Sequence, residues 1–214
     1  VEYAGRCDLF EGLNIWKEEA YCKIQGTYPV ISLSFANVKE KTYENTKLRI
    51  CQLITELYNK NRFLLDSNSL TEDDKKYFTG IHIDMPEVEA TFSLHKLAGF
   101  LYKHYGKRVI ILLDEYDTPM QEAYVDGYWE ELVAFTRSLF NTTFKTNPYL
   151  ERAIMTGITR VSKESVFSDL NHLEVVTTTA NKYIDCFGFT EEEVFAAMDE
   201  YGYTDKSLVK AWYD

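Results

Sequence analysis

The chain has 214 residues, of which 45% are apolar and 15% aromatic, so it can bury a substantial core and is not a disordered protein. Its 34 acidic and 23 basic residues give a net charge of −11, which argues against nucleic acid or an anionic membrane as a general partner. No stretch reaches the ~20 apolar residues of a membrane span, and four scattered cysteines without metal-site spacing predict reduced thiols in a cytoplasmic protein.

The first half of the chain predicts one strand followed by helices. Pro29–Phe35 is apolar and β-branched, which favours a buried strand. Apolar residues at a period near 3.6 predict a helix from about Thr42 to Leu65. An acidic helix start at residues 69–74 and a connector at Ile81–Pro86 precede a further helix, from Glu87 or Ser93 to Tyr105.

The most informative segment is Val109–Asp117, with the sequence VIILLDEYD. Its apolar run indicates a strand of a parallel sheet, and the strand ends in the adjacent carboxylates of Asp114 and Glu115. Ligands of open α/β sheets bind at the carboxyl ends of the strands. Two carboxylates at that edge can hold a metal ion and activate water. Acidic residues at a strand end can also be merely solvated or cap a helix.

The second half of the chain continues the alternation. Thr118-Pro119 predicts a loop, Gly127 to about Lys145 an amphipathic helix, and Leu150–Ile158 the next strand. Glu174–Thr179 is a weaker strand candidate, and Glu191–Gly202 a helix opened by a capping box. Alternating strands and helices predict an α/β fold with a mostly parallel sheet.

Four long motifs occur in order along the chain, at Tyr28–Lys39, Tyr105–Tyr124, Asn147–Leu173 and Tyr183–Val194. Together they resemble a family of uncharacterised bacterial AAA-ATPase-like proteins. These predicted P-loop ATPases often carry a PD-(D/E)XK nuclease-like domain further along the chain. The resemblance implies a three-layer sheet flanked by helices over residues 1–188 and the start of a small helical lid over residues 189–214.

One element of the family pattern is missing from the chain. The family has a G-x-x-x-x-G-K-[ST] phosphate loop, and this sequence contains none. We therefore expect this chain alone to bind ATP poorly and to be inactive. The start at Val1 suggests a fragment, while loss of the loop in evolution is the alternative. Because the family places the loop's strand centrally, we expect a rearranged sheet or self-association through exposed edges.

By the resemblance, Asp114 ends a Walker B strand and holds the Mg²⁺ of MgATP, and Glu115 is the base that polarises the attacking water. Asp117 is a further nucleotide contact, with an Asx-type turn before Thr118-Pro119 as the alternative.

The end of the next strand supplies further candidates. Thr156 and Thr159 can sense the nucleotide, and Arg160 can stabilise charge that develops during phosphoryl transfer. The alternative for Arg160 is a structural ion pair with Asp114 or Glu115.

The resulting prediction is the core of an ATPase that uses ATP and Mg²⁺ in a longer protein. A rival is a non-catalytic α/β interaction or regulatory module. A metal-dependent nuclease using Asp114, Glu115 and Asp117 is weaker, because Glu115-Tyr116-Asp117 lacks the lysine that such sites require.

Overall fold

The structure is a computed structural model that describes residues 5–158, 170, 173–184, 186 and 188–213. Contacts divide the chain into two compact units, Val1–Asn171 and His172–Asp214. Each unit is described by itself.

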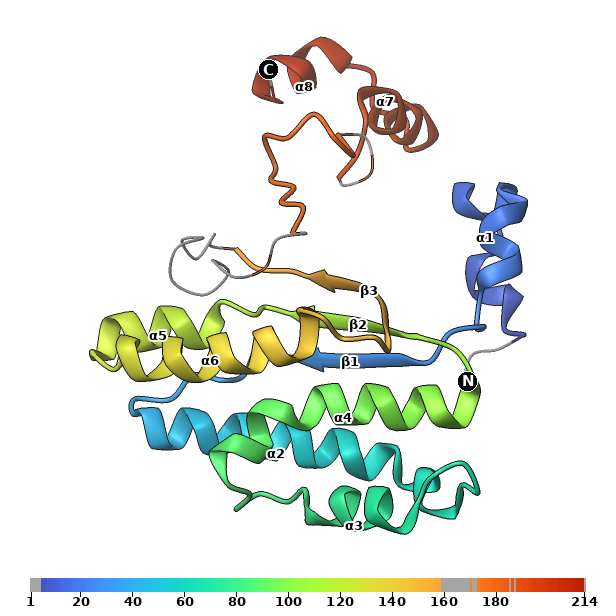
Figure 1. Cartoon of the computed structure of the whole chain (residues 1–214). Helices are drawn as coiled ribbons and strands as arrows, with labels where there is room; N and C mark the ends of the chain where they lie inside the picture. The colour runs from blue at the N-terminus through green and yellow to red at the C-terminus, as the bar shows by residue number, and fades with distance from the viewer. Residues whose placement is uncertain (1–4, 159–169, 171–172, 185, 187, 214) are drawn as a thin grey trace. The chain divides into compact units, whose positions relative to one another are not determined.

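The first unit is built on a parallel three-stranded sheet (Figure 1). Its strands are β1 (Val30–Ser34), β2 (Val109–Asp114) and β3 (Leu150–Met155), in the order β1-β2-β3. All three predicted strands of this region are confirmed, although β3 ends before the predicted Ile158. The three strands are hydrogen-bonded neighbours, so the absence of the phosphate-loop strand leaves no gap between them. Among the described residues, the outer edges of β1 and β3 are unpaired.

The three long amphipathic predictions are confirmed as helices α2 (Tyr43–Lys60), α4 (Glu87–Tyr105) and α6 (Trp129–Phe144), and local side chains fix helix ends. The Thr42 side chain accepts a hydrogen bond from the Asn45 amide at the start of α2. Gly106 ends α4 in the left-handed conformation, with φ of 66°. The helical elements of this unit are η1 (Cys7–Phe10), η2 (Asn14–Lys17), α1 (Glu19–Ile24), α2 (Tyr43–Lys60), η3 (Arg62–Asp66), α3 (Glu72–Gly80), α4 (Glu87–Tyr105), α5 (Thr118–Asp126) and α6 (Trp129–Phe144).

Two local predictions are wrong. The Thr118-Pro119 loop is instead the first turn of α5, because proline is tolerated where a helix begins and Met120 and Ala123 bury one side of that helix. The strand predicted at Glu174–Thr179 does not form, since Thr177 accepts a turn hydrogen bond from the Ala180 amide.

The two faces of the sheet differ. Side chains of Ile31, Leu33, Ile111 and Leu113 point to the face packed by α2, α4 and α6, and all four are at most 6% exposed. Burial of these side chains, together with the apolar core residues of the helices, stabilises the first unit.

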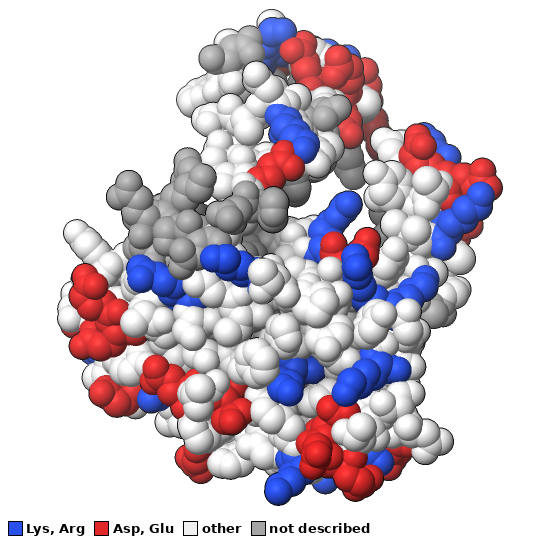
Figure 2. Space-filling model, in the orientation of Figure 1, with Lys and Arg blue, Asp and Glu red and all other residues white. Residues whose placement is uncertain are grey.

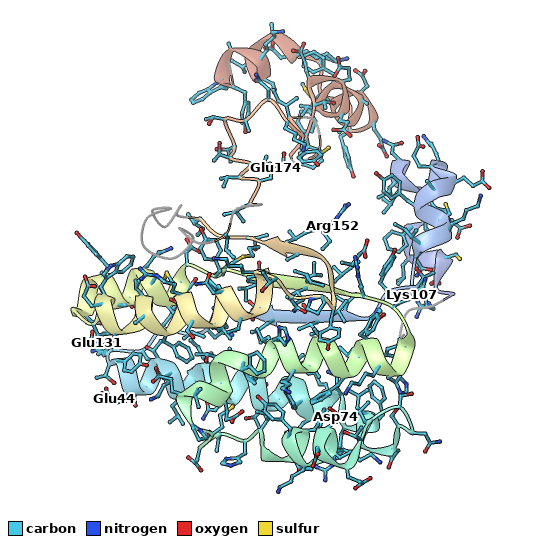
Figure 3. The ribbon with its side chains drawn as sticks, in the orientation of Figure 1. Glu44, Asp74, Lys107, Glu131, Arg152 and Glu174 are labelled. Carbon is cyan, nitrogen blue, oxygen red and sulfur yellow. The ribbon has the colours of Figure 1, made fainter. Side chains whose placement is uncertain are left out.

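The opposite face is open among the described residues of the first unit. Val30 is 48% exposed and Ile154 is 53% exposed, while Leu112 between them is half-buried. Arg152 projects from β3 on this face (Figure 3). The predicted three-layer arrangement is therefore present as two layers, a parallel sheet with helices on one face.

The second unit contains α7 (Glu191–Glu200) and α8 (Lys206–Tyr213). Thr190 and Glu193 form the predicted capping box at the start of α7. The division after Asn171 lies upstream of the predicted lid start at residue 189, and the lid role stays a prediction.

Cysteines, metal-ligating side chains and membrane-spanning helices were the subjects of three general expectations. All four cysteines are free thiols. Within the described ranges, no three histidine, cysteine or carboxylate side chains gather as metal ligands. No helix in the described part combines the length and apolar character needed to cross a bilayer.

Candidate functional site

The site centres on Asp114, which ends the middle strand of the sheet. Its neighbours are Ser34 at the end of β1 and Thr156 just after β3. Asp114 Oδ1 accepts a hydrogen bond from Thr156 Oγ1 at 2.6 Å, and Oδ2 accepts one from Ser34 Oγ at 3.1 Å. The parallel register thus brings one side chain from each strand to the same carboxyl edge.

The two hydroxyl donors favour the ionised form of the Asp114 carboxyl. Hydrogen bonds from Thr156 first, and from Ser34 second, hold the pKa of Asp114 below its ordinary value. The side chain is exposed, so an ionised carboxylate is presented to solvent. Such a group can receive a cation or donors from a ligand.

Glu115 forms the connection between β2 and α5 and has a left-handed backbone, with φ of 48°. A residue with a Cβ rarely adopts this conformation, so surrounding bonds must hold it. The Glu115 amide donates to Thr156 Oγ1 at 3.4 Å, and Glu115 Oε2 accepts from Thr118 Oγ1 at 3.0 Å. Its carboxylate is therefore held against the first turn of α5.

Asp117 does not lie with the exposed side chains of Ser34, Asp114 and Thr156. Its side chain is 1% exposed, and Asp117 Oδ2 accepts a hydrogen bond from Gln121 Nε2 at 3.0 Å. It makes no side-chain capping bond to α5, which disfavours the Asx-type turn. A Cβ added to Gly157 would lie 2.4 Å from Asp117 Oδ1, so the glycine permits this close packing. Asp117 therefore packs between Gly157, which follows β3, and the first turns of α5.

Of the other predicted residues, Thr156 lies beside Asp114, as its place after β3 predicts. Thr159 and Arg160 lie outside the described residues, and their roles stay predictions. Sequence reasoning missed Ser34. The polar alternation of Ser32 and Ser34 within the first strand was the available signal, but the strand register was needed to pair Ser34 with Asp114.

The side chains at this edge fit one part of a magnesium site. Asp114 offers a carboxylate, and Ser34 and Thr156 offer hydroxyl oxygens, which are the hard ligands that Mg²⁺ prefers. They do not form a complete protein cage. This suits Mg²⁺, which usually takes one or two carboxylates and completes its sphere with water and phosphate oxygens.

A comparison with known protein families matches residues 2–167 to the family described as Predicted AAA-ATPase. The chain belongs to this family. The match includes all three strands of this AAA-ATPase-like chain, together with Ser34, Asp114, Glu115 and Thr156.

A curated protein also resembles the chain. The chain is 25% identical over 214 residues to the uncharacterized protein in the vnfD 5′ region of Azotobacter chroococcum mcd 1. The match covers 99% of this chain and 37% of the relative, so the chain spans well under half of that protein. No solved structure matches the chain.

Proposed function

We propose that this chain supplies the Walker B half of an ATPase site in a longer AAA-ATPase-like protein. The observation that carries the proposal is the position of Asp114 at the end of the central parallel strand, with hydroxyl donors from both neighbouring strands. Membership of the predicted AAA-ATPase family supports the same general activity.

In this proposal Asp114 holds the magnesium side of the nucleotide. Its lowered pKa keeps the carboxylate charged near neutral pH, and Ser34 and Thr156 fix the orientation of its two oxygens. MgATP, when bound, supplies an electrophilic γ-phosphorus and a divalent cation that neutralises phosphate charge. Thr156 can lie near the phosphates while it positions Asp114.

Glu115 is proposed as the group that orients the attacking water. The left-handed turn at Glu115 directs the chain into α5, and Thr118 restrains the carboxylate through one oxygen. A restrained carboxylate next to the metal ligand is the arrangement that a general base needs. Thr159 and Arg160 complete the proposed site as nucleotide-sensing and charge-stabilising residues.

The sheet leaves a place for the missing phosphate loop. A strand could pair with the outer edge of β3, which is unpaired in the described part of the chain, next to Thr156. Crossover connections between parallel strands are right-handed. The two crossovers that run from β1 to β2 and from β2 to β3 contain α2, α4, α5 and α6, and they lie on one face of the sheet. A connection from beyond β3 back to β1 must therefore cross the opposite, open face. One upstream strand would pair with the edge of β3, and the helix after it would cover the open face and place its N-terminus near Asp114.

Titration of a fluorescent ATP analogue with Mg²⁺ tests the proposal in two proteins, this chain and a longer protein that includes the segment upstream of Val1. We expect tight binding only by the longer protein, because backbone amides of a phosphate loop supply most triphosphate affinity. If neither protein binds, the ATPase proposal fails and the non-catalytic interaction module replaces it.

Substitutions in the longer protein separate the two acidic roles. Glu115→Gln should keep nucleotide binding and lower the hydrolysis rate by a factor on the order of 10² or more, since a general base contributes 10²–10⁴. Asp114→Asn should weaken the Mg²⁺-dependent part of binding. Glu131→Gln, a charge removal on the exposed start of α6, is the control and should change neither property. Full hydrolysis by Glu115→Gln would overturn its assignment.

A further inference from the structure

The second unit carries an apolar groove on the surface of α7. The groove has a volume of about 410 Å³ and lies along two turns of the helix, with the aromatic residues Phe189, Tyr201 and Tyr203 at its ends. Val194, Ala197 and Met198 of α7 also line the groove and are called its floor below. All of these residues belong to the second unit, so the groove is a property of that unit alone.

The described residues of the second unit do not cover the apolar side chains of this groove. No residue of α7 or α8 is buried, and Phe189, Tyr201 and Tyr203 are 84%, 76% and 67% exposed. A unit of this size buries too little apolar surface to form an independent core. Exposed aromatic side chains gathered in one concave surface are typical of a docking site for another chain.

The charges of the unit are distributed unequally around α7. Each of the three lysines in residues 173–213 already has a carboxylate partner. Lys206 pairs with Asp199 at 2.7 Å and Lys210 with Glu191 at 2.8 Å, which ties α8 to α7. Lys206 also lies over the Phe195 ring, 5.3 Å from its centroid. The remaining lysine, Lys182, pairs with Glu174 at 2.5 Å.

The helical period separates this paired side of α7 from the groove. Glu191, Phe195 and Asp199 recur at intervals of four and face α8. Glu193 lines the groove, and Glu200, seven residues later, follows it on the same margin. Figure 2 shows acidic side chains gathered over this helix. The groove thus has an apolar floor and an anionic margin that no lysine of the described unit neutralises.

We propose that this groove binds a basic amphipathic helix of a partner protein. Apolar side chains of the partner would enter between the aromatic residues, and its Lys or Arg residues would lie along the Glu193–Glu200 margin. A helix fits because the groove follows α7 for about 12 Å, at 1.5 Å per residue, which accommodates two turns of a second helix. The negative charges of Glu193 and Glu200 favour a basic partner over an acidic one.

Fluorescence anisotropy with two labelled peptides tests this proposal on the whole chain. Both peptides have about 18 residues, five helical turns, and the same leucine stripe, but one carries Lys and the other Glu on its polar face. We expect the Lys peptide to bind and the Glu peptide to bind at least about tenfold more weakly. Equal binding of the two peptides would overturn the charge assignment.

Variants locate the binding and exclude a general electrostatic effect. Met198→Ser removes an apolar contact from the floor and should weaken the Lys peptide about tenfold. Glu200→Lys should weaken it about threefold to tenfold. Glu192→Lys makes the same charge change on the opposite side of α7 and is the matched control. Equal effects of Glu200→Lys and Glu192→Lys would contradict the proposal.

A second copy of the chain is the competing occupant. Sedimentation velocity should show the same association state for the wild-type chain and for Met198→Ser. If the wild type self-associates and Met198→Ser abolishes the association, the groove is an interface between copies and the partner proposed here is wrong. Circular dichroism of each variant verifies that α7 is still folded.

Discussion

The two faces of the sheet have similar aliphatic residues but different environments. Ile111, on the face under the helices, is 1% exposed, whereas Ile154, on the open face of the neighbouring strand, is 53% exposed. Parallel sheets are normally covered on both faces. The helix-covered face therefore stabilises this chain, while the face that is open among the described residues of the first unit, with its carboxyl edge, can bind other groups.

Matched isoleucine substitutions give the largest expected difference between the faces. Ile111→Ala should lower the free energy of unfolding by about 2–5 kcal/mol, because it removes buried contacts and leaves a cavity. Ile154→Ala should change it by about 0.5 kcal/mol or less. Urea denaturation of both variants measures the difference. Equal losses would mean that the open face is covered in solution.

Gly157 tests the close packing at the end of β3. Gly157→Ala should cost about 1–3 kcal/mol, since its Cβ would lie 2.4 Å from Asp117 Oδ1 and 2.9 Å from Tyr116 Cε1. Gly80→Ala is the control, because nothing lies within 4 Å of its Cβ and alanine is the better helix former. We expect Gly80→Ala to be neutral or stabilising in the same denaturation experiment. A neutral Gly157→Ala would show that this junction is loose.

Asp74 adds a pH-dependent contribution on the outer side of the helix layer (Figure 3). Burial alone would raise its pKa, but the Lys103 ammonium at 2.6 Å and hydrogen bonds from Thr71 lower it below 3.8 overall. A lowered folded-state pKa stabilises the fold above 3.8, and this stabilisation is lost as pH falls through the folded value.

The wild type should therefore be more stable than Asp74→Asn at neutral pH, and the difference should shrink as the pH falls below 3.8 and through the lowered folded-state pKa. Urea denaturation across this range measures it, with Asp73→Asn in the same helical turn as the control. A difference independent of pH would contradict the role of the Asp74 charge.

The smallest predicted effect lies at the open edge. Thr156→Val should raise the pKa of Asp114 toward its ordinary value of 3.8, because the shorter of its two hydroxyl hydrogen bonds is lost. Ser34→Ala should raise this pKa by less. NMR titration of the Asp114 carboxyl measures both shifts. If neither substitution moves the pKa, the two hydroxyls do not position this carboxylate in solution.

Much of the fold follows from local sequence patterns. The apolar run of Val109–Asp114, the Gly106 helix end and the capping box at Thr190 each act within a few residues, so they could be predicted. The loop predicted at Thr118-Pro119 failed because proline is compatible with both a turn and a first helical turn. Burial of Met120 decides between them.

The candidate site shows the same division. Asp114 and Glu115 could be found from the end of the apolar run, and Thr156 from its place after the next strand. Their proposed catalytic roles, and those of Thr159 and Arg160, remain predictions. The nuclease-like domain suggested by the resemblance also remains a prediction.

The amino-acid sequence alone was enough to predict the parallel α/β class and the acidic strand end, because these depend on short-range periodicity, and its long motifs carried the family resemblance. The tertiary structure was needed to show that Ser34 contacts Asp114, that Asp117 is buried against Gly157, and that helices cover one face of the sheet among the described residues of the first unit. Those features depend on register and packing between segments about 40 to 80 residues apart, as in the Thr156–Asp114 and Ser34–Asp114 hydrogen bonds. Local pattern does not encode such pairings.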